Sequence, residues 1–105
     1  EDLPVFHFAR VDGDGTLVQS SDGVDSSQLS TGNYSVDFNT DVSGCCWNAT
    51  ATQDWAPSAQ EVFIDLTQGG SSPGPGGVET EWIFASLQDH EATNTDASFD
   101  LWVVC

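Results

Sequence analysis

Alternation of apolar and polar residues with a period of two is the feature of this 105-residue sequence that most restricts its fold. In "NYSVDFN", residues 33–39, the side chains of Tyr34, Val36 and Phe38 fall on one side of an extended chain and polar side chains fall on the other. Successive side chains of a strand point to opposite faces, so this pattern predicts a half-buried strand. "EVFIDLT" and "SFDLWVVC" show the same period. "VFHFARV" is apolar on both sides, and we expect both of its faces to be covered.

Turn signals separate these segments at intervals of about ten residues. The stretches "DGDG", "SSDG", "STGN", "DVSG" and "QGGSSPGPGG" are rich in the residues that mark turns and loops. No window shows the apolar spacing of an amphipathic helix. Short strands with frequent turns are typical of antiparallel sandwiches. The sequence therefore predicts one all-β domain over residues 1–105, an antiparallel β-sandwich or jelly-roll-like fold.

Three cysteines are present, and the same alternation predicts how they pair. Cys45 falls on the same side as Trp47 and two alanines, whereas Cys46 falls on the polar side. Cys105 shares a side with the apolar residues of the terminal segment. The period thus favours a Cys45–Cys105 disulfide that closes the domain, in an oxidising compartment outside the cytoplasm. A vicinal Cys45–Cys46 bridge is the alternative, although it needs a strained ring.

Cys46 is then left over on the polar face. In a secreted protein, an odd cysteine indicates intermolecular pairing or a free thiol. We expect a half-buried free thiol at a sheet edge or subunit contact, with an interchain disulfide as the other interpretation.

Charge is the strongest compositional signal, with 17 acidic side chains, a single base (Arg10) and a formal net charge of -16. Acidic disordered chains lack aromatic residues, but this sequence has four Trp and six Phe. A folded domain with this charge fits molar salt, where the Debye length is about 3 Å. The composition therefore predicts a halophilic protein. It argues against nucleic acid as a partner, and no apolar run is long enough for membrane insertion.

Three stretches, "FARVDGDGTLVQSSDGV", "STGNYSVDFNTDVSGC" and "FDLWVVC", resemble an uncharacterised secreted β-rich domain of actinobacterial and other prokaryotic proteins. The shared pattern is "TGxYxVxF", then "VSGC", then "FxLxVxC", and it spans nearly the whole chain except residues 55–77. The single cysteine of that pattern corresponds to Cys45, in agreement with the period-two pairing, and Cys46 departs from it. The domain often stands at the C-terminal end of surface proteins, which implies a distal head domain and no particular reaction.

"DGDGT" places Asp12 and Asp14 in the manner of a calcium loop. Gly23 stands where such a loop needs an acidic residue, so a hairpin turn is the favoured interpretation. His7 and His90 lack metal-ligand spacing, so we expect His7 to be a core or edge histidine and His90 a solvated loop residue. We expect no metal and no cofactor.

Two N-glycosylation motifs begin at Asn33 and Asn48, so the protein is a candidate glycoprotein. Trp55 has a loop-like context and is the candidate for stacking on sugar. Trp102 and Val104 make a second apolar side on the terminal segment, which predicts cover by another sheet or by a neighbouring subunit.

No nucleophile, phosphate-loop or metalloprotease motif is recognisable, so we do not expect an enzyme. The leading hypothesis is an extracellular head or adhesion domain of a halophilic cell surface or virion. It is expected to form a homo-oligomer, with a trimer favoured, and to bind a glycan or another cell-surface ligand. A carbohydrate-binding module that uses Trp55 is the alternative, and a small secreted hydrolase comes third.

Overall fold

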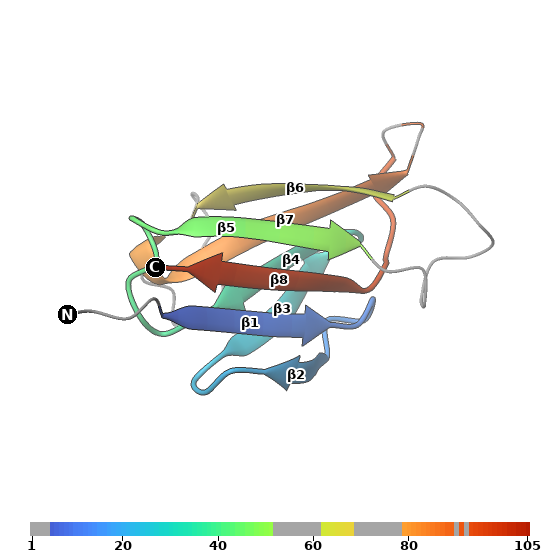
Figure 1. The fold of residues 1–105 in the computed structure, drawn as a ribbon. Helices are drawn as coiled ribbons and strands as arrows, with labels where there is room; N and C mark the ends of the chain where they lie inside the picture. Colours follow the sequence, from blue (N-terminus) through green and yellow to red (C-terminus); the bar gives the residue numbers. More distant parts are fainter. Residues whose placement is uncertain (1–4, 52–61, 69–78, 90, 92) are drawn as a thin grey trace.

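The computed structural model describes residues 5–51, 62–68, 79–89, 91 and 93–105, which form two four-stranded antiparallel sheets packed together (Figure 1). Sheet A has the strand order β2-β1-β8-β5 and consists of β1 (Phe6–Val11), β2 (Leu17–Ser20), β5 (Cys46–Ala51) and β8 (Phe99–Val104). Sheet B has the order β3-β4-β7-β6 and consists of β3 (Asp25–Ser30), β4 (Asn33–Asp37), β6 (Val62–Gln68) and β7 (Trp82–Asp89). A short 3-10 helix, Glu79–Glu81, precedes β7. The predicted all-β sandwich is confirmed.

The two central strands of sheet A are the first and the last strands of the chain. β1 pairs with β8 over its full length, with Ala9 opposite Leu101, and β8 pairs on its other side with β5. In Figure 1 sheet A lies in front, and β3, β4 and β7 of sheet B lie behind it. No helix in the described part of the chain is long and apolar enough to cross a membrane.

The core lies between the two sheets and follows the predicted alternation. The core cluster includes large buried residues from β4, β7, β8, the end of β1 and the segment before β5: Val11, Tyr34, Val36, Val42, Ile83, Leu87, Phe99, Leu101 and Val103. Trp82 at the start of β7 is also buried. The inward face of β5, including Trp47 and Ala49, packs against this cluster. Strands whose apolar residues recur at every second position therefore bury those residues together, as expected from their pleat.

The expectation of a half-buried strand at residues 33–39 is wrong for the second face of β4. Ser35 and Asp37 project away from the core, yet both are buried. β4 is a central strand, so neighbours on both sides shield these short side chains. Ser35 lies opposite Ser27 of β3 and Phe84 of β7. Asp37 lies opposite Asp25 of β3 and Trp82 of β7.

The expectation that both faces of β1 are covered is also wrong. Ala9 and Val11 are buried, but Phe6 and Phe8 remain 65% and 44% exposed. They project from the outer face of sheet A, over which no other described strand packs.

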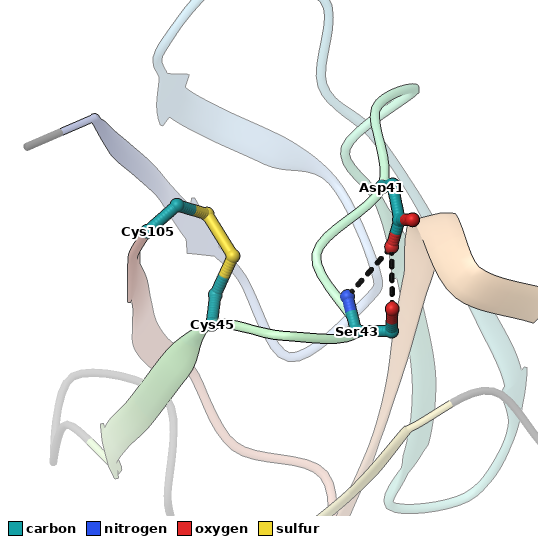
Figure 2. Close-up of a disulfide and its surroundings, with 4 residues drawn as sticks. All are labelled: Asp41, Ser43, Cys45 and Cys105. Atoms are coloured by element: carbon teal, nitrogen blue, oxygen red, sulfur yellow. Dashed lines mark hydrogen bonds between the residues drawn. A yellow bond between two sulfur atoms is a disulfide. The ribbon is translucent and has the colours of Figure 1, made fainter. Parts of the chain in front are cut away.

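The disulfide joins Cys45 to Cys105, with the two Cα atoms 4.4 Å apart, and confirms the pairing derived from the period of two (Figure 2). Just before Cys45, the Asp41 carboxylate accepts hydrogen bonds from the Ser43 Oγ and N at 2.6 and 2.9 Å. These bonds lower the pKa of Asp41 and shape the turn that delivers Cys45 to the end of β8. Cys46 is outside any disulfide and exposed, so the expectation of a half-buried thiol is wrong, because the outer face of sheet A leaves it open to solvent.

Candidate functional site

The outer face of sheet A carries nine side chains in three rows, because the register of β1, β8 and β5 sets their residues side by side. We call this set the aromatic face. Its rows are Phe6, Val104 and Cys46; then Phe8, Trp102 and Asn48; then Arg10, Asp100 and Thr50.

Aromatic residues dominate the first two rows of this face. Phe6, Phe8 and Trp102 are 65%, 44% and 42% exposed. Phe8 lies directly opposite Trp102 in the ladder, and side chains so placed stand about 5 Å apart at Cβ. Val104 lies opposite Phe6 in the neighbouring row. The sheet therefore presents a contiguous apolar surface to solvent, and the second apolar side predicted from Trp102 and Val104 is real.

The third row contains an ion pair that balances the charge of the face. Arg10 Nε lies 2.7 Å from Asp100 Oδ1, and Nη2 lies 3.2 Å from Oδ2. This two-point geometry is the strong arrangement for an arginine and a carboxylate. Arg10 is the single base of the chain, and Asp100 is the one acidic residue among the nine. The aromatic face is thus neutral on a chain whose net charge is -16.

A hollow of about 150 Å³ opens between the second and third rows of the aromatic face. It is lined by Phe8, Ala9, Arg10, Gln19, Asp100, Leu101 and Trp102. Aromatic rings therefore stand beside a guanidinium, a carboxylate and an amide. A few polar groups in an otherwise apolar hollow are typical of small-molecule sites.

A second hollow, of about 240 Å³, lies on sheet B and is lined by Asp25, Ser26, Ser27, Ser35 and Asp37. Asn39, which has a left-handed backbone with φ 56°, engages both carboxylates. Its N donates to Asp37 Oδ1 at 2.8 Å, and its Nδ2 donates to Asp25 Oδ2 at 3.2 Å and to Gly23 O at 2.6 Å. These carboxylates therefore hold a strained turn residue in place.

The "DGDGT" segment forms the predicted turn. Gly15 has φ 89°, and Asp12 and Thr16 are joined by a hydrogen bond between their backbones at 2.9 Å. Asp14 Oδ1 accepts from the Thr16 N at 2.9 Å, and this contact lowers the pKa of Asp14. Within the described ranges, no three acidic, histidine or cysteine side chains gather as metal ligands would.

The remaining candidates fall in different places. Asn33 begins β4 and donates its Nδ2 to Ser30 Oγ at 2.8 Å, whereas Asn48 is exposed on the aromatic face next to Trp102. His7 is half-buried, with its ring 5.8 Å from that of Phe38. Trp55 and His90 lie outside the described residues.

The ion pair is the part of this surface that sequence reasoning missed. A signal was present, because Arg10 alternates with Phe6 and Phe8, and Asp100 stands two residues before Trp102. The sequence does not show the register of β1 against β8, which places Arg10 opposite Asp100 although the two residues are 90 positions apart.

Family models, curated proteins and solved structures yield no match to this chain. The resemblance to a secreted prokaryotic domain therefore stays a prediction.

Proposed function

We propose that this chain is a non-enzymatic, extracellular attachment domain, the homo-oligomeric head of a surface or virion protein from a halophilic source. The observation that carries the proposal is the exposed aromatic face. The largest contiguous apolar patch on a monomeric soluble protein, about 300–600 Å², is often the surface that makes its contacts. A neutral aromatic patch on a strongly anionic domain is best explained as a contact surface.

Two further observations support the compartment and the salt regime of the proposal. The Cys45–Cys105 disulfide joins parts of the chain 60 residues apart, and structural disulfides persist mainly in oxidising surroundings. The chain has 17 acidic side chains but one arginine and no lysine, so most of its negative charge has no basic side chain to balance it. Molar salt would screen their repulsion.

Carbohydrate binding is a second candidate, favoured by the hollow beside Phe8 and Trp102. A sugar ring has an apolar face that stacks on aromatic rings and hydroxyl groups that bond to charged and amide side chains. The side chains of Arg10, Asp100 and Gln19 supply such partners at the rim. In this form the carbohydrate-binding hypothesis uses Phe8 and Trp102, while a role for Trp55, which lies outside the described residues, stays a prediction.

Binding of the labelled domain to a glycan array and to cells of halophilic organisms, in about 1 M salt, tests the proposal. Phe8→Ala and Trp102→Ala remove the contact surface. Phe63→Ala is the matched control, since Phe63 is 54% exposed but belongs to sheet B.

The proposal expects the wild type and Phe63→Ala to bind, and the other two variants to lose at least about tenfold in affinity, or about 1.4 kcal/mol. Glycans recovered unchanged agree with a binding domain, whereas cleaved glycans would support a small secreted hydrolase. Absence of binding to every surface by the wild type would refute attachment.

A further inference from the structure

We infer that the aromatic face pairs with the aromatic face of a second copy of this chain. The inference rests on the proposed function, since it names the partner through which the head oligomerises. It is argued from the charge of the face, its self-complementarity, its area and the position of Cys46.

Charge selects the face through which two copies can approach. Each copy carries a net charge of -16, so most contacts would bring uncompensated carboxylates together. On the outer face of sheet B, for example, the exposed carboxylates of Asp25 and Asp65 would meet those of the other copy. The aromatic face has one acid and one base, already joined at 2.7 Å. Two copies meeting there bring together no unbalanced charge from the nine residues.

The same ion pair makes the face complementary to itself. In a two-fold contact, the same patch serves both subunits. A patch with a base beside an acid can exchange partners across such a contact, so that Arg10 of each copy also attracts Asp100 of the other. A foreign partner would need to match both the neutral charge and the aromatic surface, whereas a second copy has both.

The available area predicts that the pair is weak. A Phe or Trp side chain can bury about 150–250 Å², so three half-exposed aromatic residues offer about 300 Å² per copy. This area is at the lower end of the roughly 300–600 Å² of the largest apolar patch on a typical monomer. It is well below the roughly 800 Å² that each partner buries in a standard interface. We therefore expect pairing that depends on protein concentration and that strengthens in molar salt, where repulsion between the remaining carboxylates is screened.

Cys46 supplies an internal reporter. Its exposed thiol lies at the corner of the aromatic face, in the row of Val104 and Phe6. Pairing covers this row, so the rate at which a thiol reagent modifies Cys46 should fall as the protein concentration rises.

Sedimentation equilibrium over a range of protein concentrations, in about 0.1 M and about 1 M sodium chloride, tests the inference. The wild type should approach twice the monomer mass in the higher salt, and Phe8→Ala and Trp102→Ala should each raise the dissociation constant at least tenfold, while Phe63→Ala leaves it unchanged. All four proteins should show the same thermal unfolding, because these side chains lie outside the core. If Phe8→Ala nevertheless unfolds, protection of the Cys46 thiol in wild type and Phe63→Ala still decides the question.

A monomer at every concentration would overturn the pairing, and so would equal disruption by Phe63→Ala. A trimer, the assembly favoured from the sequence alone, would also overturn it. Pairing and surface binding compete for Phe8 and Trp102, so surface binding is measured at protein concentrations below the dissociation constant of the pair. The inference and the attachment role then fail separately. A monomer that still binds glycans through Phe8 and Trp102 refutes the pair and keeps attachment. A dimer that binds no surface keeps the pair and refutes attachment.

Discussion

Ionisation of Tyr34 should control the stability of the domain at high pH. Tyr34 is the single tyrosine of the chain and is fully buried. Its hydroxyl donates to Gly13 O at 2.8 Å and lies 3.4 Å from Asp96 Oδ1, and its ring packs 5.2 Å from that of Phe99. Burial, and then the negative charge of Asp96, raise the pKa of Tyr34 to about 12.

The raised pKa fixes the direction of the effect. In the unfolded chain the phenol ionises near its ordinary pKa of 10.0, while in the folded protein it keeps its proton. Its contribution to stability is therefore complete below pH 10 and is lost as the pH rises toward 12. The pKa of Tyr34 is higher by about 2 in the folded than in the unfolded state, which corresponds to about 2.7 kcal/mol of stability. This is a large part of a typical free energy of unfolding of about 5–15 kcal/mol.

Denaturant unfolding between pH 8 and 12 measures the free energy of unfolding, and near-ultraviolet absorbance of the phenolate measures the pKa of Tyr34. A Cys46→Ser background removes the free thiol and so prevents its exchange with the disulfide at high pH. The free energy of unfolding should fall by about 2–3 kcal/mol above pH 10, and the absorbance of the folded protein should rise only near pH 12.

Tyr34→Phe is the control for this effect. It should be less stable at neutral pH by about 1–3 kcal/mol, because the buried Gly13 carbonyl loses its donor, and its stability should not fall over the same alkaline range. A folded protein whose phenolate appears near pH 10, or a Tyr34→Phe variant with the same alkaline loss, would refute the reasoning.

Three further predictions concern stability. Gly32→Ala should be more destabilising than Gly23→Ala by about 1–3 kcal/mol. Both glycines have positive φ, but a Cβ added at Gly32 would lie 2.6 Å from Leu87 O, whereas one added at Gly23 would meet nothing within 4 Å. Equal losses of stability in chemical denaturation would contradict this. Replacing Cys45 and Cys105 together by serine should cost about 4 kcal/mol from the loop they close, which denaturation compares with the wild type. The melting temperature should climb steeply up to about 1 M salt and gently above it, and a flat profile in calorimetry would argue against a halophilic protein.

The inward-facing residues could be predicted from sequence because a strand has a fixed period. Tyr34, Val36 and Phe38 alternate with polar residues, and so do Cys45 and Trp47, which is enough to decide which side of each strand enters the core. The disulfide followed from the same rule, since it only requires that both cysteines share the inner side.

The pairing of strands could not be predicted, because it depends on contacts between distant parts of the chain. Nothing local to β1 indicates that β8 lies beside it and that no other described strand packs on its outer face, so the exposure of Phe6 and Phe8 could not be predicted. The burial of Ser35 has the same origin, since neighbours on both sides shield it. The candidate site is defined by register, so the sequence contained its residues but not their arrangement.

The aromatic face brings two sequence-based expectations into conflict. Asn48 begins a glycosylation motif and lies in the same row as Trp102 and Phe8. A glycan attached to its side chain would lie over these rings, and a second copy could then not cover them. Asn33 lies on the opposite sheet, so a glycan there leaves the aromatic face free. Occupancy at Asn48 and pairing through the aromatic face would therefore exclude each other, so the mass of the Asn48 peptide decides whether pairing is open to this chain.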